Sequence, residues 1–197
     1  MNTMRLAIAS ALLALLAACG STPPNNYYVL TAEVNAAANA QTPSIGVGPI
    51  TIPEYLNRNS MVFQQSGNQL DIDKSERWAE PLTDGIQRVM SINLGSALGT
   101  QNVQGFPWSA GQTPDYGVAV RILNLDANAS GAEMVAEWEV RHPADGGTLT
   151  RQITQLEAGY QGAGFSAESA AAAYSDLLRQ LSDQAAEVIS ANQSKQD

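Results

Sequence analysis

The first 19 residues place the strongest constraint on what this chain can fold into. After a weakly basic start with Arg5, an apolar run of about 12 residues covers 6–17 and leads into the tetrad Leu-Ala-Ala-Cys, which closes at Cys19. A run of that length suits the core of a signal peptide, whereas a membrane-spanning helix takes roughly 20 residues. The sequence therefore predicts that residues 1–18 are a signal peptide, removed from the mature chain, and that the fold begins after them.

Cys19 is the only cysteine in the sequence, so an intramolecular disulfide is impossible. Its small-small-Cys context resembles the lipobox of bacterial lipoproteins, which implies a mature chain that begins at Cys19 with a diacylated (palmitate-type) side chain and an acylated amino group. Two or three acyl chains hold a protein on a membrane effectively permanently. Gly20 stands where the resemblance to Gram-negative lipoproteins makes Asp the usual inner-membrane retention signal, so we expect the periplasmic face of the outer membrane. An ordinary secreted protein with an unused thiol is the alternative.

The size and charge of the mature chain limit its partners. About 180 of the 197 residues remain after processing, enough for one domain with one core. Residues 19–26 are the expected lipidated cysteine and tether, 27–192 the single domain, and 193–197 a disordered tail. The formal net charge of −9 becomes one unit more negative when Arg5 is lost, and this opposes binding to nucleic acid.

Hydrophobic periodicity predicts the secondary structure. An apolar pattern with a period of two predicts strands over residues 27–31, 45–52, 61–65, 69–73, 116–122, 134–141 and 149–158. A three-to-four residue period predicts a helix over 76–98, whose regular part starts near Glu80 because Pro81 fits only a first turn. A second helix is expected over 167–191, with Ser166 as its N-cap. A parity switch beside Gly48 predicts a bulge in a strand near a sheet edge, and residues 36–42 are expected to form a loop.

The order of these elements predicts an α+β fold. We expect a two-layer sandwich in which both helices cover one face of a mostly antiparallel sheet and the other face stays wet. Trp78 and Trp138 fall on apolar faces and are expected in the core. Glu137 and Glu139 share the polar face of one strand and are expected to keep it soluble, because glycosidase chemistry requires two carboxylates across a cleft.

The sequence offers little that could support catalysis or bind a metal. His142 is the only histidine and precedes Pro143, so we interpret it as a turn residue; a lipid-anchored periplasmic hydrolase built around it is the alternative. The acidic residues Asp71, Asp73 and Glu76 could hold calcium but lack the spacing of an EF-hand loop, and a solvated strand end is the preferred interpretation. We therefore predict no catalytic residues, no metal and no cofactor apart from the covalent lipid on Cys19.

Two loops carry residue types that are enriched in protein interfaces. One contains Phe106 and Trp108, and the other contains Tyr55, Leu56 and Arg58. These five residues are the candidates for a partner or oligomer interface. For the two aromatic residues of the first loop, burial in the loop's own small cluster is the alternative.

Three stretches together resemble the paraquat-inducible protein C (PqiC) family, the auxiliary lipoproteins of ABC-type lipid transport systems. They are Asn-Tyr-Tyr-Val-Leu at 26–30, Ile-Pro-Glu-Tyr-Leu-Asn-Arg at 52–58 and Trp-Ala-Glu-Pro-Leu at 78–82. Later segments are similar mainly in pattern, through the pair Glu137–Trp138 and a closing helix. The order and spacing of the three stretches extend the resemblance over nearly the whole mature domain.

The resemblance implies a non-enzymatic component on the outer membrane. Its partner would be an MCE-domain protein, anchored in the inner membrane, that forms a tunnel across the periplasm, and the family resembles homo-oligomeric, ring-forming docking pieces. Within the motifs, the resemblance implies that Tyr55, Leu56 and Arg58 lie on the surface, whereas Trp78 and Leu82 pack inside. A monomeric lipid carrier with an apolar cavity in the domain is a further alternative.

Overall fold

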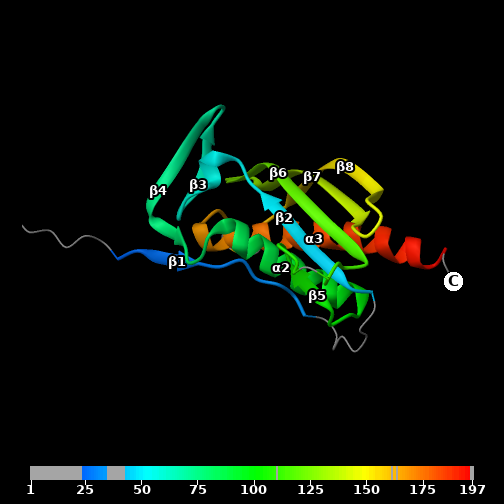
Figure 1. The fold of residues 1–197 in the computed structure, drawn as a ribbon. Helices are drawn as coiled ribbons and strands as arrows, with labels where there is room; N and C mark the ends of the chain where they lie inside the picture. The colour runs from blue at the N-terminus through cyan, green and yellow to red at the C-terminus, as the bar shows by residue number, and fades with distance from the viewer. Residues whose placement is uncertain (1–23, 35–42, 110, 161, 163, 196–197) are drawn as a thin grey trace, which may run out of the picture.

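A computed structural model describes residues 24–34, 43–109, 111–160, 162 and 164–195; Cys19, the signal segment and the expected loop at 36–42 lie outside this part of the chain. The described residues form an α+β domain in which a sheet lies over a layer of two helices (Figure 1). The elements are β1 (Asn26–Tyr28), β2 (Ile45–Thr51), the 3-10 turn η1 (Glu54–Leu56), β3 (Ser60–Ser66), β4 (Gln69–Trp78), α2 (Leu82–Leu98), β5 (Val103–Gly105), β6 (Tyr116–Asn128), β7 (Gly131–His142), β8 (Gly147–Ala158) and α3 (Ala167–Gln193).

The larger sheet has five strands in the order β5-β2-β6-β7-β8. Strands β6, β7 and β8 form the antiparallel meander that the sequence predicts, but β2 runs parallel to both of its neighbours. The sheet is therefore mixed rather than purely antiparallel, and the longest ladders are the antiparallel ones of the meander. The reason for the parallel pairing is that α2 carries the chain back along the sheet between β2 and the later strands, and such a crossover makes the strands parallel.

The predicted bulge lies in β2, where the pairing with β6 shifts register between Val47 and Ile50. Only Ile45–Val47 of β2 pair with β5, so the rest of β2 has no partner on that side. Strand β5, which the sequence analysis did not predict, is three residues long and forms the edge of the sheet.

A smaller three-stranded sheet has the order β1-β4-β3. Its hairpin is longer than predicted, because β4 continues to Trp78 and pairs there with β1. Trp78 therefore belongs to a strand and not to the helix in which its spacing placed it. Pro81 precedes α2, and its missing N–H and fixed φ suit a helix start that lies beyond Trp78.

Both helices cover the same face of the larger sheet, as predicted, and the core lies between the two layers. Trp138 and Leu177 are fully buried there, and Trp78 packs against Tyr174 with 6.2 Å between ring centroids. Ser166 caps α3 by accepting a hydrogen bond from the backbone N–H of Ser169, in a capping box. None of the helices in the described part of the chain is long and apolar enough to span a membrane.

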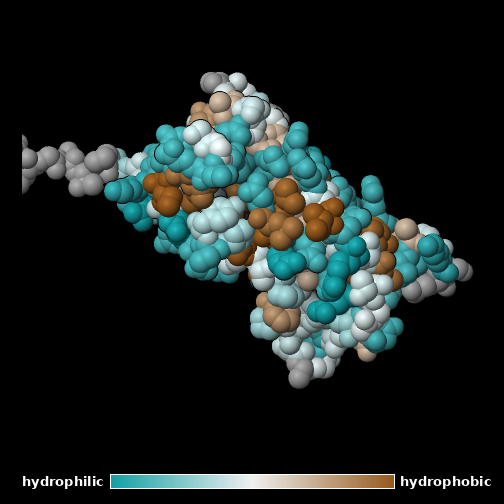
Figure 2. Space-filling model, turned by 90° about the horizontal axis from the view of Figure 1, so that it is seen from above, coloured by the Kyte–Doolittle hydropathy of each residue, from teal (hydrophilic) through white to brown (hydrophobic). Residues whose placement is uncertain are grey.

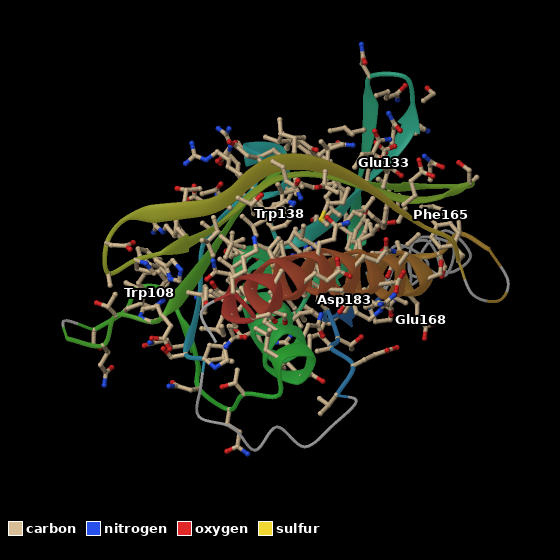
Figure 3. The ribbon with its side chains drawn as sticks, turned by 90° about the vertical axis from the view of Figure 1, so that its right-hand side faces the viewer. Trp108, Glu133, Trp138, Phe165, Glu168 and Asp183 are labelled. Carbon is tan, nitrogen blue, oxygen red and sulfur yellow. The ribbon has the colours of Figure 1, made fainter. Side chains whose placement is uncertain are left out.

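The β3–β4 hairpin stands at one end of the two-layer body (Figures 1 and 3). Its base reaches the helix layer, where the backbone N–H of Ala79 donates to the carbonyl of Tyr28 at 2.9 Å. Further along, the backbone N–H of Gln64 donates to the Asp126 carboxylate on β6 at 2.7 Å, and burial raises the pKa of this carboxyl. The hairpin thus joins the helix side of the molecule to the opposite side of the sheet.

Candidate docking surface

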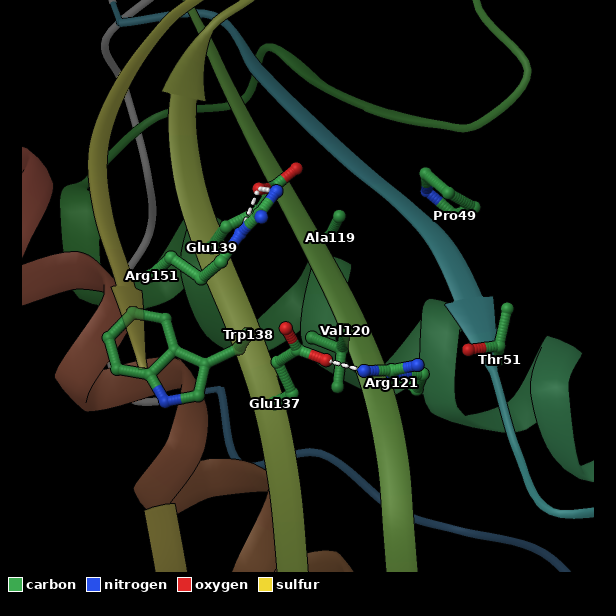
Figure 4. A pocket seen from close by; sticks show the side chains of 9 residues that line it. All are labelled: Pro49, Thr51, Ala119, Val120, Arg121, Glu137, Trp138, Glu139 and Arg151. Carbon is green, nitrogen blue, oxygen red and sulfur yellow. Dashed lines mark hydrogen bonds and ion pairs between the residues drawn. The ribbon is translucent and has the colours of Figure 1, made fainter. Parts of the chain in front are cut away.

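The sheet face that points away from the helices, here called the outer face, carries charged side chains on the three neighbouring strands β6, β7 and β8. Strand pairing aligns Arg121 with Glu137 and Glu139 with Arg151, because side chains of one parity on neighbouring strands share a face. The Arg121 guanidinium pairs with Glu137, and Arg151 pairs with Glu139 at 2.5 Å (Figure 4). Arg141 lies 3.8 Å from the same Glu139 carboxylate.

The arginines cover the carboxylates. The side chains of Arg121 and Arg151 are 61% and 63% exposed, whereas those of Glu137 and Glu139 are 25% and 15% exposed. The hydrogen bond to Glu139 raises the pKa of Arg151, so this guanidinium stays charged at every physiological pH. The most exposed groups of these pairs are therefore guanidinium groups, although each arginine is paired with a glutamate and the whole chain has a net charge of −9.

A shallow pocket of about 250 Å³ opens between these ion pairs and β2. Pro49 and Thr51 line one side, and the arginine–glutamate pairs line the other (Figure 4). Beside it, the exposed side chains of Leu123 and Ile153 give the face an apolar part. Figure 2 shows hydrophobic side chains gathered near the middle of this face. An apolar centre with exposed arginines at its margin is the composition expected of a protein-binding surface.

The loop containing Tyr55, Leu56 and Arg58 fits its predicted role only in part. Leu56 is buried in the core, so the expectation of a surface position is wrong for this residue. Tyr55 is half-buried and donates its hydroxyl hydrogen to the Asn124 side chain at 3.1 Å, and burial raises the pKa of Tyr55. Arg58 is exposed. The 3-10 turn η1 turns Leu56 inward, which a linear motif does not reveal.

The two aromatic residues of the other loop have different environments. The Trp108 ring lies close to the paired glycines Gly46 and Gly117, where a Cβ on Gly46 would come within 2.4 Å of the indole. Phe106 stays exposed and meets Trp108 edge to face, with ring centroids 5.5 Å apart. Trp108 therefore fixes the loop to the sheet (Figure 3), and Phe106 remains the interface candidate.

Replacing Gly46 by Val is expected to expel the Trp108 ring from its place on the sheet. No room exists for the new side chain, because the Pro114 ring also lies 2.6 Å from the Cβ position. We expect a loss of about 1–3 kcal/mol in the free energy of unfolding, as for other overpacked sites, with a red shift of tryptophan emission. Gly159→Ala is the matched control, since nothing lies within 4 Å of its Cβ position. Unchanged stability and emission in Gly46→Val would contradict this placement of Trp108.

His142 has a structural environment. Its Nδ1 lies 2.9 Å from the carbonyl of Asp115 and its Nε2 3.3 Å from the Asn192 side chain, and the ring packs on Tyr116 at 4.7 Å. Through Nδ1 the ring contacts the residue before β6, and through Nε2 it contacts the end of α3, so His142 connects these two parts of the domain. This environment fits the predicted structural role better than that of a general base in a hydrolase.

Among the acidic residues of β4, Asp73 forms hydrogen bonds within its own strand. The Asp73 carboxylate accepts hydrogen bonds from Ser75 N–H, Ser75 hydroxyl and Glu76 N–H, which lower the pKa of Asp73. Its donors thus come from the strand itself. The interpretation as a strand end is wrong, because β4 continues to Trp78 and the acidic residues lie within it, where its pairing with β3 shifts register. No group of three or more His, Cys, Asp or Glu side chains suited to a metal occurs in the part of the chain that the structure describes.

Comparison with known proteins identifies the class. Residues 28–186 match the family described as ABC-type transport auxiliary lipoprotein component, and the chain belongs to this family. The intermembrane transport lipoprotein PqiC of Escherichia coli K12 is 27% identical over 147 residues, which cover 72% of this chain and 75% of that protein. The PqiC of Shigella flexneri matches equally well. The resemblance found in the sequence motifs is thereby confirmed.

Solved structures confirm the fold. The protein XCC0632 from Xanthomonas campestris superposes with a TM-score of 0.68 at 15% identity, over 87% of this chain and 99% of that one. An uncharacterized protein of known structure gives the same TM-score at 21% identity, over 85% and 99% of the two chains. The described domain thus shares its fold with other proteins of known structure.

Sequence reasoning missed Arg121 and Arg151. Arg121 stands between Val120 and Ile122 in its predicted strand, so it could have been placed on a polar face. Arg151 stands between Thr150 and Gln152, and this polar surrounding gives no such signal. The pairing of the two arginines with Glu137 and Glu139 depends on strand register, and this follows from the structure alone. A pattern that could have predicted the ion pairs is the presence of two arginines and two glutamates in three consecutive predicted strands.

Proposed function

We propose that this protein is an outer-membrane lipoprotein that docks the end of an MCE-domain protein and so helps to complete a lipid conduit between the two membranes. The observation that carries the proposal is the family match over 28–186, joined to a lipidation motif at Cys19. Membership in a family of transport auxiliary lipoproteins supports a role in intermembrane transport. The MCE partner, the outer membrane and assembly into a homo-oligomeric ring go beyond the match and are part of the proposal.

The outer face is the proposed docking surface for this partner. It combines exposed guanidinium groups with apolar side chains, and the hairpin and the Trp108 loop bound it at its two ends. The exposed guanidinium groups would pair with acidic side chains of the partner and fix its orientation on this face. The core between sheet and helices is filled by side chains such as Trp138, Met134 and Leu177, so the alternative of a monomeric lipid carrier gains no support from it.

Affinity purification from detergent-solubilised membranes tests the proposal. The native protein is expected to recover an MCE-domain protein, and the double variant Arg121→Glu/Arg151→Glu is expected to recover at least about tenfold less. Removing one partner of a charge pair that is buried in an interface typically costs about 2–5 kcal/mol, and about 1.4 kcal/mol corresponds to tenfold.

The matched control is Arg179→Glu/Lys195→Glu, which changes the net charge equally but outside the outer face. Arg179 forms only surface pairs with Asp176 and Asp183, so we expect little loss of stability. Equal loss of binding in both double variants would show that overall charge, not the outer face, governs docking. Recovery of no MCE protein by the native protein would overturn the proposed function.

A further inference from the structure

Exposed apolar side chains are concentrated where the tether enters the domain. Ten large hydrophobic residues are exposed in the described part of the chain, and three of them, Tyr27, Val29 and Val34, lie within residues 24–34. The side chains of Tyr27 and Val29 are 62% and 48% exposed. The alternate residues, Tyr28 and Leu30, point inward. The alternation gives this segment one apolar face toward solvent.

The segment is fixed to the helix layer on the side away from the larger sheet. The Leu30 carbonyl accepts a hydrogen bond from the Arg88 guanidinium of α2 at 2.9 Å, and the Thr31 amide donates to the Ser175 hydroxyl of α3 at 3.0 Å. Figure 1 shows the segment running beneath both helices, with the sheet above them. Tyr27 and Val29 therefore keep a defined orientation relative to the outer face.

The chain length before this segment brings it close to the lipid anchor. About eight residues separate Cys19 from Tyr27, and even a fully extended chain of that length spans no more than about 28 Å. Because the tether is short, the effective concentration of the bilayer at this surface is high. Even a weak apolar contact between the surface and the bilayer is then formed for much of the time. Tyrosine suits such a place, because its ring is apolar and its hydroxyl can reach the headgroups.

We propose that Tyr27 and Val29 rest in the headgroup region of the bilayer to which Cys19 is attached. The helix layer then faces the membrane, and the outer face with its arginines points into the aqueous space. The contact rests on apolar side chains, because the nearby charges are of both signs. Arg77 is the strand partner of Tyr27 and Arg88 binds the Leu30 carbonyl, while Glu33 and Glu76 are acidic. This orientation rests on the lipidation of Cys19 but does not require the MCE partner of the proposed function.

Site-directed fluorescence on the lipidated full-length protein tests the orientation. Acylation occupies the single native cysteine, so Val29→Cys introduces one free thiol for an environment-sensitive fluorophore. The matched control is Ile153→Cys, which replaces an apolar residue that is 66% exposed on the outer face. In phosphatidylcholine vesicles with brominated acyl chains, the label at position 29 should lose roughly half of its emission or more, as an interfacial apolar group buried several ångströms deep would. The label at position 153 should be unaffected.

Each other result overturns the inference. If vesicles float the protein but neither label is quenched, or both are quenched equally, the domain has no preferred membrane face. Quenching at position 153 alone would mean that the outer face contacts the bilayer. If the protein does not float with vesicles, the lipid anchor itself is absent, and the outer-membrane part of the proposed function fails with it; failure to recover an MCE protein would leave the orientation result unchanged.

Discussion

Replacing Cys19 by Ala should move the whole population of this protein from the membrane fraction to the soluble periplasmic fraction. Each buried methylene contributes roughly 0.8 kcal/mol to membrane attachment, so removing two or three acyl chains abolishes it. The described part of the chain offers no replacement. The exposed arginines of the outer face are paired with glutamates, and the described helices include none that could span the bilayer. Two apolar side chains at β1 are too few to hold the domain without the anchor.

Fractionation of cell envelopes with immunodetection measures this change. Gly20→Asp is the matched control, because the resemblance to Gram-negative lipoproteins implies that it keeps the acyl chains but retains the protein at the inner membrane. We expect Cys19→Ala in the soluble fraction and Gly20→Asp in the inner-membrane fraction. A Cys19→Ala protein that stays in washed membranes would show that something other than lipid holds it there.

Much of the fold could be predicted from periodicity. The strands of the meander, the hairpin and both helices follow clear patterns, and the Ser166 cap marked the start of α3 within one residue. These elements have one buried face, so burial imposes the spacing that the sequence displays. The parallel pairing of β2 could not be predicted in this way. Alternation of apolar and polar residues shows which face of the sheet a side chain occupies, but not which strands are neighbours or in which direction they run.

The predictions that failed involve residues whose environment depends on distant parts of the chain. Leu56 looks like a loop residue in the sequence, but the turn η1 directs it into the core. Trp78 continues the spacing of α2, yet strands β1 and β3 pair with its segment before the helix can begin. Trp108 is fixed by two glycines that are 71 positions apart in the sequence, Gly46 and Gly117. None of these relations is local.

The candidate docking surface shows the same division. Glu137 and Glu139 could be assigned to a polar face from their spacing, but their ion pairs with Arg121 and Arg151 required the register of three strands. The structure thus changes their interpretation from solvated carboxylates to half-buried partners of exposed arginines. This pairing determines that the guanidinium groups, and not the carboxylates, are the more exposed charged groups on the outer face.

Replacing Trp138 by Ala should have the largest effect on stability of any single change in the described core. The side chain is 1% exposed, lies between β7 and α3, and donates its indole N–H to the Thr154 hydroxyl at 2.9 Å. Thr154 lies next to Gln184 of α3, so this hydrogen bond belongs to the contact between the two layers. Truncation of a buried tryptophan typically costs about 3–5 kcal/mol. For a domain of this size that corresponds to a fall of roughly 6–20 °C in Tm.

Thermal unfolding of the non-acylated protein, followed by circular dichroism, measures this loss. Trp138→Phe is the informative companion variant, because it keeps most of the ring volume and removes the hydrogen bond. If packing dominates, Trp138→Phe should lose much less than Trp138→Ala. Equal losses would instead mean that the hydrogen bond to Thr154 holds the layers together. A Tm for Trp138→Ala within a degree or two of the native value would contradict the packing of β7 on α3, and with it the orientation that places the arginines on the opposite face.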